Sequence, residues 1–146
     1  MYRVVLDANV LISAFSGYKH GNSITVRIVQ SLLESERAVI FISDHIAAEV
    51  GRALSRPYFR DRMTGSERMW AYEALRKPPF KRIEPVSIEG IASHVEDDAV
   101  IGTALAGEVD YLVTSDRQLL RLSRYRGFSI IDPPMFLAII EATTNP

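Results

Sequence analysis

The chain has 146 residues, contains no cysteine, and carries a formal net charge of −1 from 17 basic and 18 acidic side chains. The absence of cysteine excludes disulfide scaffolds, thiolate zinc sites, iron–sulfur clusters and cysteine nucleophiles. No apolar run reaches the roughly 18 residues needed to cross a bilayer, and an acid at position 7 interrupts the amino-terminal apolar run too early for a signal peptide. We therefore expect one cytoplasmic globular domain over residues 1–146, without membrane association.

Strand and helix patterns alternate along the chain. Apolar, β-branched runs predict strands at residues 2–6, 38–42, 82–86, 110–114 and 128–131. Helical spacing and capping residues predict helices at 8–15, 23–35, 44–54 and 66–76, and then from 97, after 116 and around 136–140. This alternation predicts an α/β fold with a central, mainly parallel sheet that has helices on both faces.

The small net charge conceals an uneven distribution of charge. Residues 83–116 contain eight acids and no lysine or arginine, whereas residues 51–82 contain nine bases and three acids. Residues 117–126 add four bases and no acid. Neutrality is therefore a cancellation between segments, and an asymmetry of this kind indicates distinct functional surfaces.

Several acids occupy positions that the fold would bring together. Asp7 and Asp116 each directly follow a predicted strand, and sites in α/β sheets form outside the carboxyl ends of the strands. Asp97 and Asp98 lie at a predicted helix start, and Glu49 lies mid-helix beside an apolar stripe. Carboxylates that converge at one edge would repel each other unless a divalent cation neutralised them. Oxygen ligands favour Mg²⁺ or Mn²⁺.

Each of these acids also has a simpler interpretation. Asp7 and Asp116 can cap the helices that follow them, and Asp97 with Asp98 can be a cap and its solvated neighbour. Glu49 can extend into solvent. The recurrence of acids at one predicted edge, in a segment without compensating bases, favours the shared site.

Four motifs follow one another along the chain. They are an apolar strand followed by Asp-x-Asn (residues 4–13), a Ser-started helix with one acid (42–50), an acid leading an Ala-rich helix (96–106), and a strand ending in Thr-x-Asp (110–120). These motifs resemble those of the PIN-domain ribonuclease family. Each motif is weak alone, but together, in this order, they span residues 2 to about 132. The branch that they resemble most is that of VapC-like toxins from toxin–antitoxin systems.

The resemblance implies a PIN-like three-layer sandwich and a metal-dependent endoribonuclease. The positions that match the family's metal-binding and catalytic acids are Asp7, Glu49, Asp97 and Asp116. Asp98 could share the ligand role, because the register is uncertain by one residue. Asn9 and Thr114 match positions that orient the acids or a bound water, and His94 stands where this branch often has another Asp.

The resemblance also implies partners: an RNA substrate, a cognate antitoxin protein and a second copy in a homodimer. Phosphate backbones bind through Lys and Arg, so the basic segments are candidate RNA contacts. The candidate RNA-binding residues are Arg52, Arg56, Arg117 and Arg121. The apolar residues expected at a partner surface are Tyr58, Phe59 and Met63.

Two alternatives remain at this stage. A catalytically weak PIN module would act as a scaffold for RNA or protein, although all four acids are present. A phosphatase with Asp7 as its nucleophile is less favoured, because position 9 is Asn instead of the usual second Asp. No lysine occurs between residues 83 and 146 to steady a phosphoryl group.

Overall fold

The computed structural model describes residues 1–19, 21–92 and 94–143. Its strands are β1 (Tyr2–Leu6), β2 (Ala38–Ile42), β3 (Phe80–Arg82), β4 (Tyr111–Val113), β5 (Arg124–Tyr125) and β6 (Phe128–Ile131). Its helices are α1 (Ala8–Gly17), α2 (Ile24–Glu34), α3 (Asp44–Leu54), α4 (Pro57–Arg60), α5 (Gly65–Ala74), α6 (Val95–Ala106), α7 (Arg117–Leu122) and α8 (Pro133–Ala142). Within this part of the chain, no helix is long and apolar enough to span a membrane.

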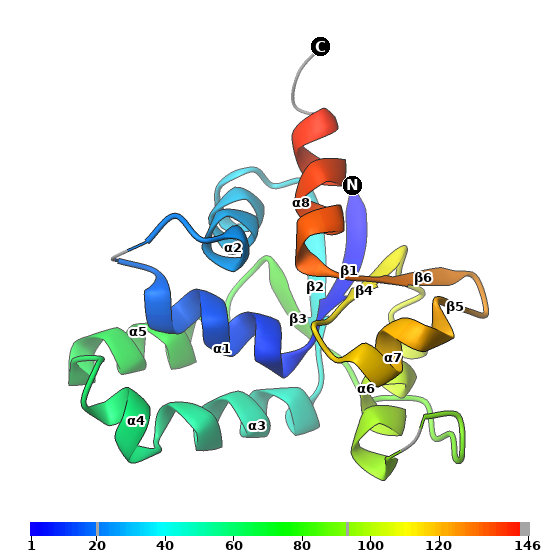
Figure 1. Ribbon diagram of the computed structural model, residues 1–146, viewed down its shortest axis with the longest axis horizontal. Coiled ribbons are helices and arrows are strands. Elements are labelled where there is room, and N and C mark those ends of the chain that lie inside the picture. Colours follow the sequence, from blue (N-terminus) through cyan, green and yellow to red (C-terminus); the bar gives the residue numbers. More distant parts are fainter. Residues whose placement is uncertain (20, 93, 144–146) are drawn as a thin grey trace.

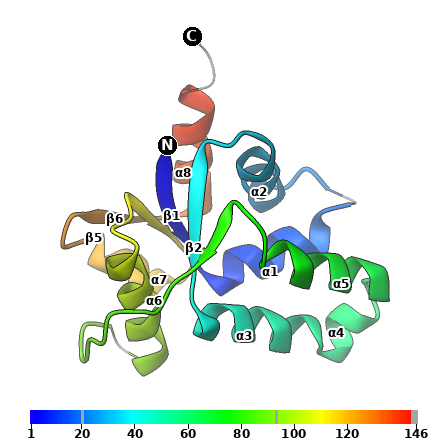
Figure 2. The same ribbon diagram turned by 180° about the vertical axis from the view of Figure 1, so that it is seen from behind.

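The strands form one sheet in the order β3-β2-β1-β4-β6-β5. The short β5 pairs antiparallel with β6, and every other pair of neighbours is parallel. Figures 1 and 2 show α6 and α7 on one side of the sheet, and α1, α2 and α5 on the other. The predicted α/β fold, with a mainly parallel sheet flanked by helices, is confirmed.

The hydrophobic core covers both faces of the central strands. Val4, Val5 and Leu6 of β1 are successive residues that point to opposite faces, and all three are buried. α6 packs against β1, β2 and β4, while the ring of Phe136 in α8 packs near those of Tyr2 and Tyr111. Burial on both faces explains why the strands are continuous apolar runs in the sequence.

Strand register brings polar residues to one level at the carboxyl edge of the sheet. Leu6 of β1 lies opposite Val113 of β4, so the next residues, Asp7 and Thr114, are neighbours. Side chains at this edge also begin the following helices, because each accepts a hydrogen bond from a backbone N–H of the first turn. The capping residues there are Asp7, Ser43, Asp116 and Asp132.

Some predicted elements differ from the structure. β3 covers Phe80–Arg82 instead of 82–86, because β2 already pairs at Pro79, whose carbonyl accepts from the Ile40 N–H at 2.9 Å. α6 begins at Val95, two residues before its predicted start. The helix α4 and the strand β5 were not predicted. Met63 is only 4% exposed, so its expected place at a partner surface is wrong.

The segment between β3 and α6 is tied to α6 at two points. The Val86 N–H donates to the Gly102 carbonyl at 3.0 Å, and a Cβ added to Gly102 would lie 2.2 Å from the Val86 carbonyl oxygen. Further along, the Asp98 carboxylate accepts hydrogen bonds from the N–H groups of residues 90–92, at 3.0, 3.1 and 2.7 Å. These contacts hold the segment between β3 and α6 against the helix.

Candidate active site

A pocket of about 200 Å³ lies at the carboxyl edge of the sheet. Its polar lining residues are Asp7, Asn9, His45, Glu49, Arg56, Glu96, Asp97 and Asp116. The four acids predicted as metal ligands therefore line one pocket, although they come from the end of β1, from α3, from α6 and from the turn before α7. This convergence follows from the parallel sheet, which directs the ends of β1 and β4 to the same edge.

Asp7 lies at the base of this pocket and is only 6% exposed. Its Oδ1 accepts from the Ala8 N–H at 2.8 Å, and its Oδ2 accepts from the Thr114 hydroxyl at 2.8 Å and from the Asn9 amide at 3.3 Å. Burial raises the pKa of Asp7. The hydrogen bonds from Thr114 and Ala8 oppose this rise, and the negative charges of Glu49 and Asp116 add to it.

Thr114 and Asn9 connect Asp7 to the turn that carries Asp116. The Thr114 hydroxyl accepts from the Asp116 N–H at 3.0 Å, and Asn9 Oδ1 accepts from the Ser115 N–H at 3.3 Å. The Asp116 carboxylate in turn accepts from the Gln118 N–H at 2.8 Å, which caps α7. Asp116 and Asp7 are therefore held by one hydrogen-bond network across β1 and β4.

Asp97 belongs to the same electrostatic cluster. Burial raises the pKa of Asp97, and the charges of Asp116, Asp7 and Glu96 raise it further, while His94 opposes the rise. Glu49 is half-buried on α3, and its charge adds to the rise in the pKa of Asp7. The charges of Asp7, Glu49 and Asp116 thus each act on another of the four acids, as expected of carboxylates that share a pocket.

The donor set of the pocket fits a divalent cation. No lysine or arginine forms an ion pair with Asp7, Glu49, Asp97 or Asp116 within residues 1–19, 21–92 and 94–143. Buried carboxylates without a cationic partner are costly. In the same ranges, no three carboxylate or imidazole groups lie close enough together to enclose an ion. The fit therefore rests on charge and on the all-oxygen chemistry of the donors, which suits Mg²⁺ or Mn²⁺.

Asp98 does not line the pocket. Its carboxylate is 5% exposed and faces the N–H groups of residues 90–92, so the idea that it shares the ligand role of Asp97 does not fit this geometry. Adjacent residues on a helix point in directions about 100° apart, and here one faces the acids and the other the loop. Asp98 is a structural residue that fastens the loop before α6.

We expect Asp98→Ala to lower the free energy of unfolding by about 3 kcal/mol, because three charge-assisted hydrogen bonds are lost and backbone N–H groups are left without their acceptor. Urea unfolding measures this change. Glu96→Ala is the matched control: Glu96 is an exposed acid on the same turn, and we expect an effect within about 0.5 kcal/mol. Equal effects of the two substitutions would contradict the structural role of Asp98.

We expect Asp7→Asn to stabilise the metal-free protein at neutral pH, and this gain to shrink as the pH falls. Burial raises the pKa of Asp7 in the folded state. At a pH between the ordinary pKa of aspartate and this raised pKa, Asp7 is therefore protonated in the folded protein but ionised in the unfolded chain. Stability contributed by wild-type Asp7 therefore rises as the pH falls through this window. Urea unfolding in EDTA at pH 7 and pH 5 tests this, and a pH-independent difference between the two proteins would count against it.

The predicted RNA-binding arginines occupy different positions. Arg56 lines the pocket, whereas Arg52, Arg117 and Arg121 are exposed and are not among its lining residues. Two further lining residues, His45 and Glu96, were given no role from the sequence. The spacing of His45, four residues before Glu49, could have placed both on one face of α3.

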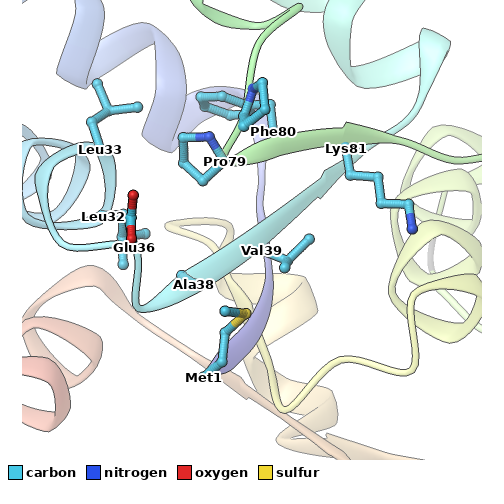
Figure 3. Close-up of a pocket in the computed structure, with 10 residues that line it drawn as sticks. Met1, Leu32, Leu33, Glu36, Ala38, Val39, Pro79, Phe80 and Lys81 are labelled. Carbon is cyan, nitrogen blue, oxygen red and sulfur yellow. The ribbon is translucent and has the colours of Figure 1, made fainter.

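A larger hollow of about 600 Å³ lies at the opposite edge of the sheet. Figure 3 shows Met1, Val39 and Phe80 around it, near the amino ends of β1, β2 and β3. Glu36 is the only acid among its lining residues, and most of the others are apolar. This hollow lacks the convergent polar groups of a catalytic site, so the candidate active site is the smaller acidic pocket.

Comparisons with known proteins identify a family and a shared fold. A family model described as "PIN domain" matches residues 3–118. No curated protein is similar enough in sequence to be matched. The PIN domain endonuclease Utp24 shares the fold with a TM-score of 0.53 and 18% identity, over 90% of this chain and 84% of that chain. A chain in the structure of VapBC2 from Rickettsia felis, bound to a DNA fragment from its promoter, has a TM-score of 0.55 and 16% identity, over 89% and 98% of the two chains.

Proposed function

The chain belongs to the PIN-domain family, a family of nucleases, and on this premise we propose that it is a divalent-metal-dependent endoribonuclease. The observation that carries the proposal is the acidic pocket, which Asp7, Glu49, Asp97 and Asp116 line together. In the described part of the chain, no lysine or arginine forms an ion pair with any of them. PIN domains typically use divalent metals, and a cation would offset the burial and the repulsion that together raise the pKa values of Asp7 and Asp97.

In this proposal Asp7, Asp97 and Asp116 would hold the ion, and Glu49 would bind it directly or through water. When bound there, Mg²⁺ or Mn²⁺ would supply an activated water nucleophile and would stabilise charge on the phosphoryl and leaving oxygens. The site residues prepare this chemistry before substrate arrives. Thr114 and Ala8 orient the Asp7 carboxylate, so that little reorganisation is needed on binding.

Two further groups have roles in the proposed hydrolysis. The Glu49 carboxylate is half-buried and faces the pocket from α3, so it can accept the proton of the attacking water. Asn9 holds the turn before α7 through its contact with the Ser115 N–H and thereby keeps Asp116 in position. The exposed Arg117 and Arg121 of α7, and Arg52 of α3, lie where they can attract the RNA backbone electrostatically.

We expect the wild-type protein to cleave single-stranded RNA in the presence of Mg²⁺ or Mn²⁺, and to lose this activity completely in EDTA. Cleavage of defined oligoribonucleotides, followed by restoration with an excess of Mn²⁺, tests the expectation. RNA binding without cleavage at any metal concentration would contradict the proposal and favour a scaffold. Release of inorganic phosphate from a phosphomonoester would instead favour a phosphatase.

The biological role that we propose is the toxin of a toxin–antitoxin pair, acting with a cognate antitoxin and as a homodimer. This proposal rests on the motif resemblance and on a fold shared with a chain of VapBC2. Its test is the induction of the protein in growing cells, where we expect growth arrest from the wild type and none from a variant that cannot cleave RNA. Unimpaired growth with an active enzyme would favour a stand-alone nuclease.

A further inference from the structure

The acidic pocket extends along α3 toward α4. Its lining residues on this helix are His45, Glu49 and Ala53, which share one face, and Arg56 lies two residues after the end of the helix, at the start of α4. Ile12 of α1 lines the same pocket, so the pocket continues between α1 and α3. Figures 1 and 2 show α3 leading from the edge of the sheet to α4. An RNA strand that enters the acidic pocket can therefore continue on a path along α3.

Arg56 stands at the outer end of this path with a guanidinium that is free to bind a ligand. Among the described residues it has no hydrogen-bond or ion-pair partner for its side chain, although it lines a pocket with five acids. Some other arginines of the chain are engaged: Arg68 donates to the Met63 carbonyl at 2.8 Å, and Arg82 donates to Asp44 at 2.9 Å. A guanidinium that faces an acidic pocket without binding its carboxylates is suited to a phosphate.

The backbone around Arg56 is held firmly. Its N–H donates to the Ala53 carbonyl at 3.1 Å, and its own carbonyl accepts from Phe59 and Arg60 at 3.0 Å each. Pro57 occupies the first position of α4, where its fixed φ favours the helix. The residue is therefore fixed at the junction of two helices, and only its side chain must be ordered on binding.

An exposed aromatic ring lies two residues beyond Arg56. Tyr58 is 58% exposed, and the Arg62 guanidinium carbon lies 3.7 Å from its ring centroid. The Phe59 ring packs edge-on against it with a centroid separation of 4.9 Å. A ring supported in this way offers its remaining surface to an unpaired base, which stacks on aromatic and guanidinium planes alike.

The charge of this region matches a polyanion. Residues 52–62 contain four arginines and a single acid, Asp61, and the charged residues among them are all exposed. An acidic pocket alone would repel RNA, so a cationic rim is needed to bring the backbone to it. Arg56 joins this cationic segment to the pocket.

We propose that Arg56 and Tyr58 form a substrate subsite continuous with the acidic pocket, in which Arg56 binds a phosphate of the RNA strand and Tyr58 stacks an unpaired base beside it. The substrate is accordingly single-stranded on the side of the cleaved bond that lies toward α4. This inference rests on the proposed nuclease function and names the substrate class of the same site.

Binding is measured with a fluorescent oligouridylate and the Asp116→Asn protein in Mg²⁺, so that cleavage does not interfere. We expect Arg56→Ala to weaken binding about ten-fold. The slope of log Kd against log salt concentration should fall by about one. Arg56→Lys should give intermediate values of both quantities. Arg76→Ala is the matched control, because Arg76 is an exposed arginine outside the pocket lining. We expect it to change Kd less than about two-fold. Equal effects of the Ala substitutions at 56 and 76 would overturn the phosphate contact.

The stacking contact is tested with Tyr58→Phe and Tyr58→Leu. Phe keeps the ring and should bind as the parent does, whereas Leu keeps apolar bulk without the ring and should bind about ten-fold more weakly. Thermal unfolding verifies that both variants are folded. Annealing the oligouridylate to oligoadenylate should abolish the difference between them, because paired bases cannot stack on the ring. A Leu variant that binds single strands as well as the Phe variant would overturn the stacking role.

The outcomes separate this subsite from the nuclease proposal. If the wild type cleaves no RNA but Arg56→Ala and Tyr58→Leu still weaken binding, the nuclease proposal fails and the subsite stands. If the wild type cleaves RNA and the same variants bind and cleave normally, the subsite is overturned. Substitutions at 56 and 58 that change the oligomeric state in sedimentation, with RNA binding unaffected, would assign the surface to a protein interface and also overturn it.

Discussion

Asp116→Asn is expected to reduce RNA cleavage by more than about a hundredfold, because loss of even an outer partner of a metal ligand costs roughly 10–100-fold and Asp116 is a proposed ligand itself. The substitution is structurally mild. Asp116 caps α7 by accepting the Gln118 N–H at 2.8 Å, and asparagine caps helices as well as aspartate does. The Asp116 charge also adds to the burial that raises the pKa values of Asp7 and Asp97, so the substitution relieves repulsion in the metal-free protein. We therefore expect a melting temperature in EDTA at or slightly above that of the wild type, together with the loss of cleavage in Mn²⁺.

Asp132→Asn is the matched control for this variant. Asp132 follows β6 at the same edge of the sheet and caps α8 by accepting the Met135 N–H at 2.9 Å, but it does not line the acidic pocket. The two substitutions thus make the same chemical change in the same structural role, and they differ only in access to the site. Wild-type cleavage by Asp116→Asn, or equal losses in both variants, would refute the proposed role of Asp116.

Gly102→Ala is expected to destabilise the protein by about 3 kcal/mol, toward the upper end of the cost of overpacking. The added Cβ would lie 2.2 Å from the Val86 carbonyl oxygen and 3.3 Å from the Pro85 Cβ, and the first of these neighbours is backbone that cannot rotate away. For a chain of this size the melting temperature should fall by roughly 6–12 °C. Because the segment after β3 must move away from α6, we also expect weaker cleavage.

Gly51→Ala provides the contrast. Gly51 lies inside α3, as Gly102 lies inside α6, but a Cβ there would meet nothing within 4 Å. The same substitution should therefore stabilise the protein by about 0.5–1 kcal/mol, the ordinary gain of Ala over Gly in a helix. Differential scanning calorimetry of the two variants tests the opposite signs, and a stable Gly102→Ala protein would show that the contact with Val86 is easily relieved.

The capping and site interpretations of the acids prove to be compatible. Asp7 caps α1 and Asp116 caps α7, as the simpler interpretation predicts, and both also line the acidic pocket. In a parallel sheet the residue after a strand is often the residue before a helix, and the helix N-terminus there favours negative charge. One position therefore serves both the fold and the candidate chemistry.

Other features depended on contacts that a local pattern does not contain. Asp97 and Asp98 are neighbours at the start of α6, and only the packing of residues 90–92 against the helix turns Asp98 away from the pocket. Arg52 and Arg56 look alike in the sequence, but only Arg56 lines the pocket. The apolar character of Met63 indicated a partner surface, whereas the folded chain buries it.

The sequence alone was sufficient for the α/β alternation, for most of the strands, and for the acids that follow them, because apolar runs and helix caps are local signals whose meaning changes little with context. Tertiary structure was needed to place β3, to tie the segment before α6 to Gly102 and Asp98, and to bring Glu49 and Arg56 into the pocket of Asp7 and Asp116. These features depend on strand register and on which side of a helix meets its neighbour. Both are set by burial between segments distant in sequence, which no local pattern specifies.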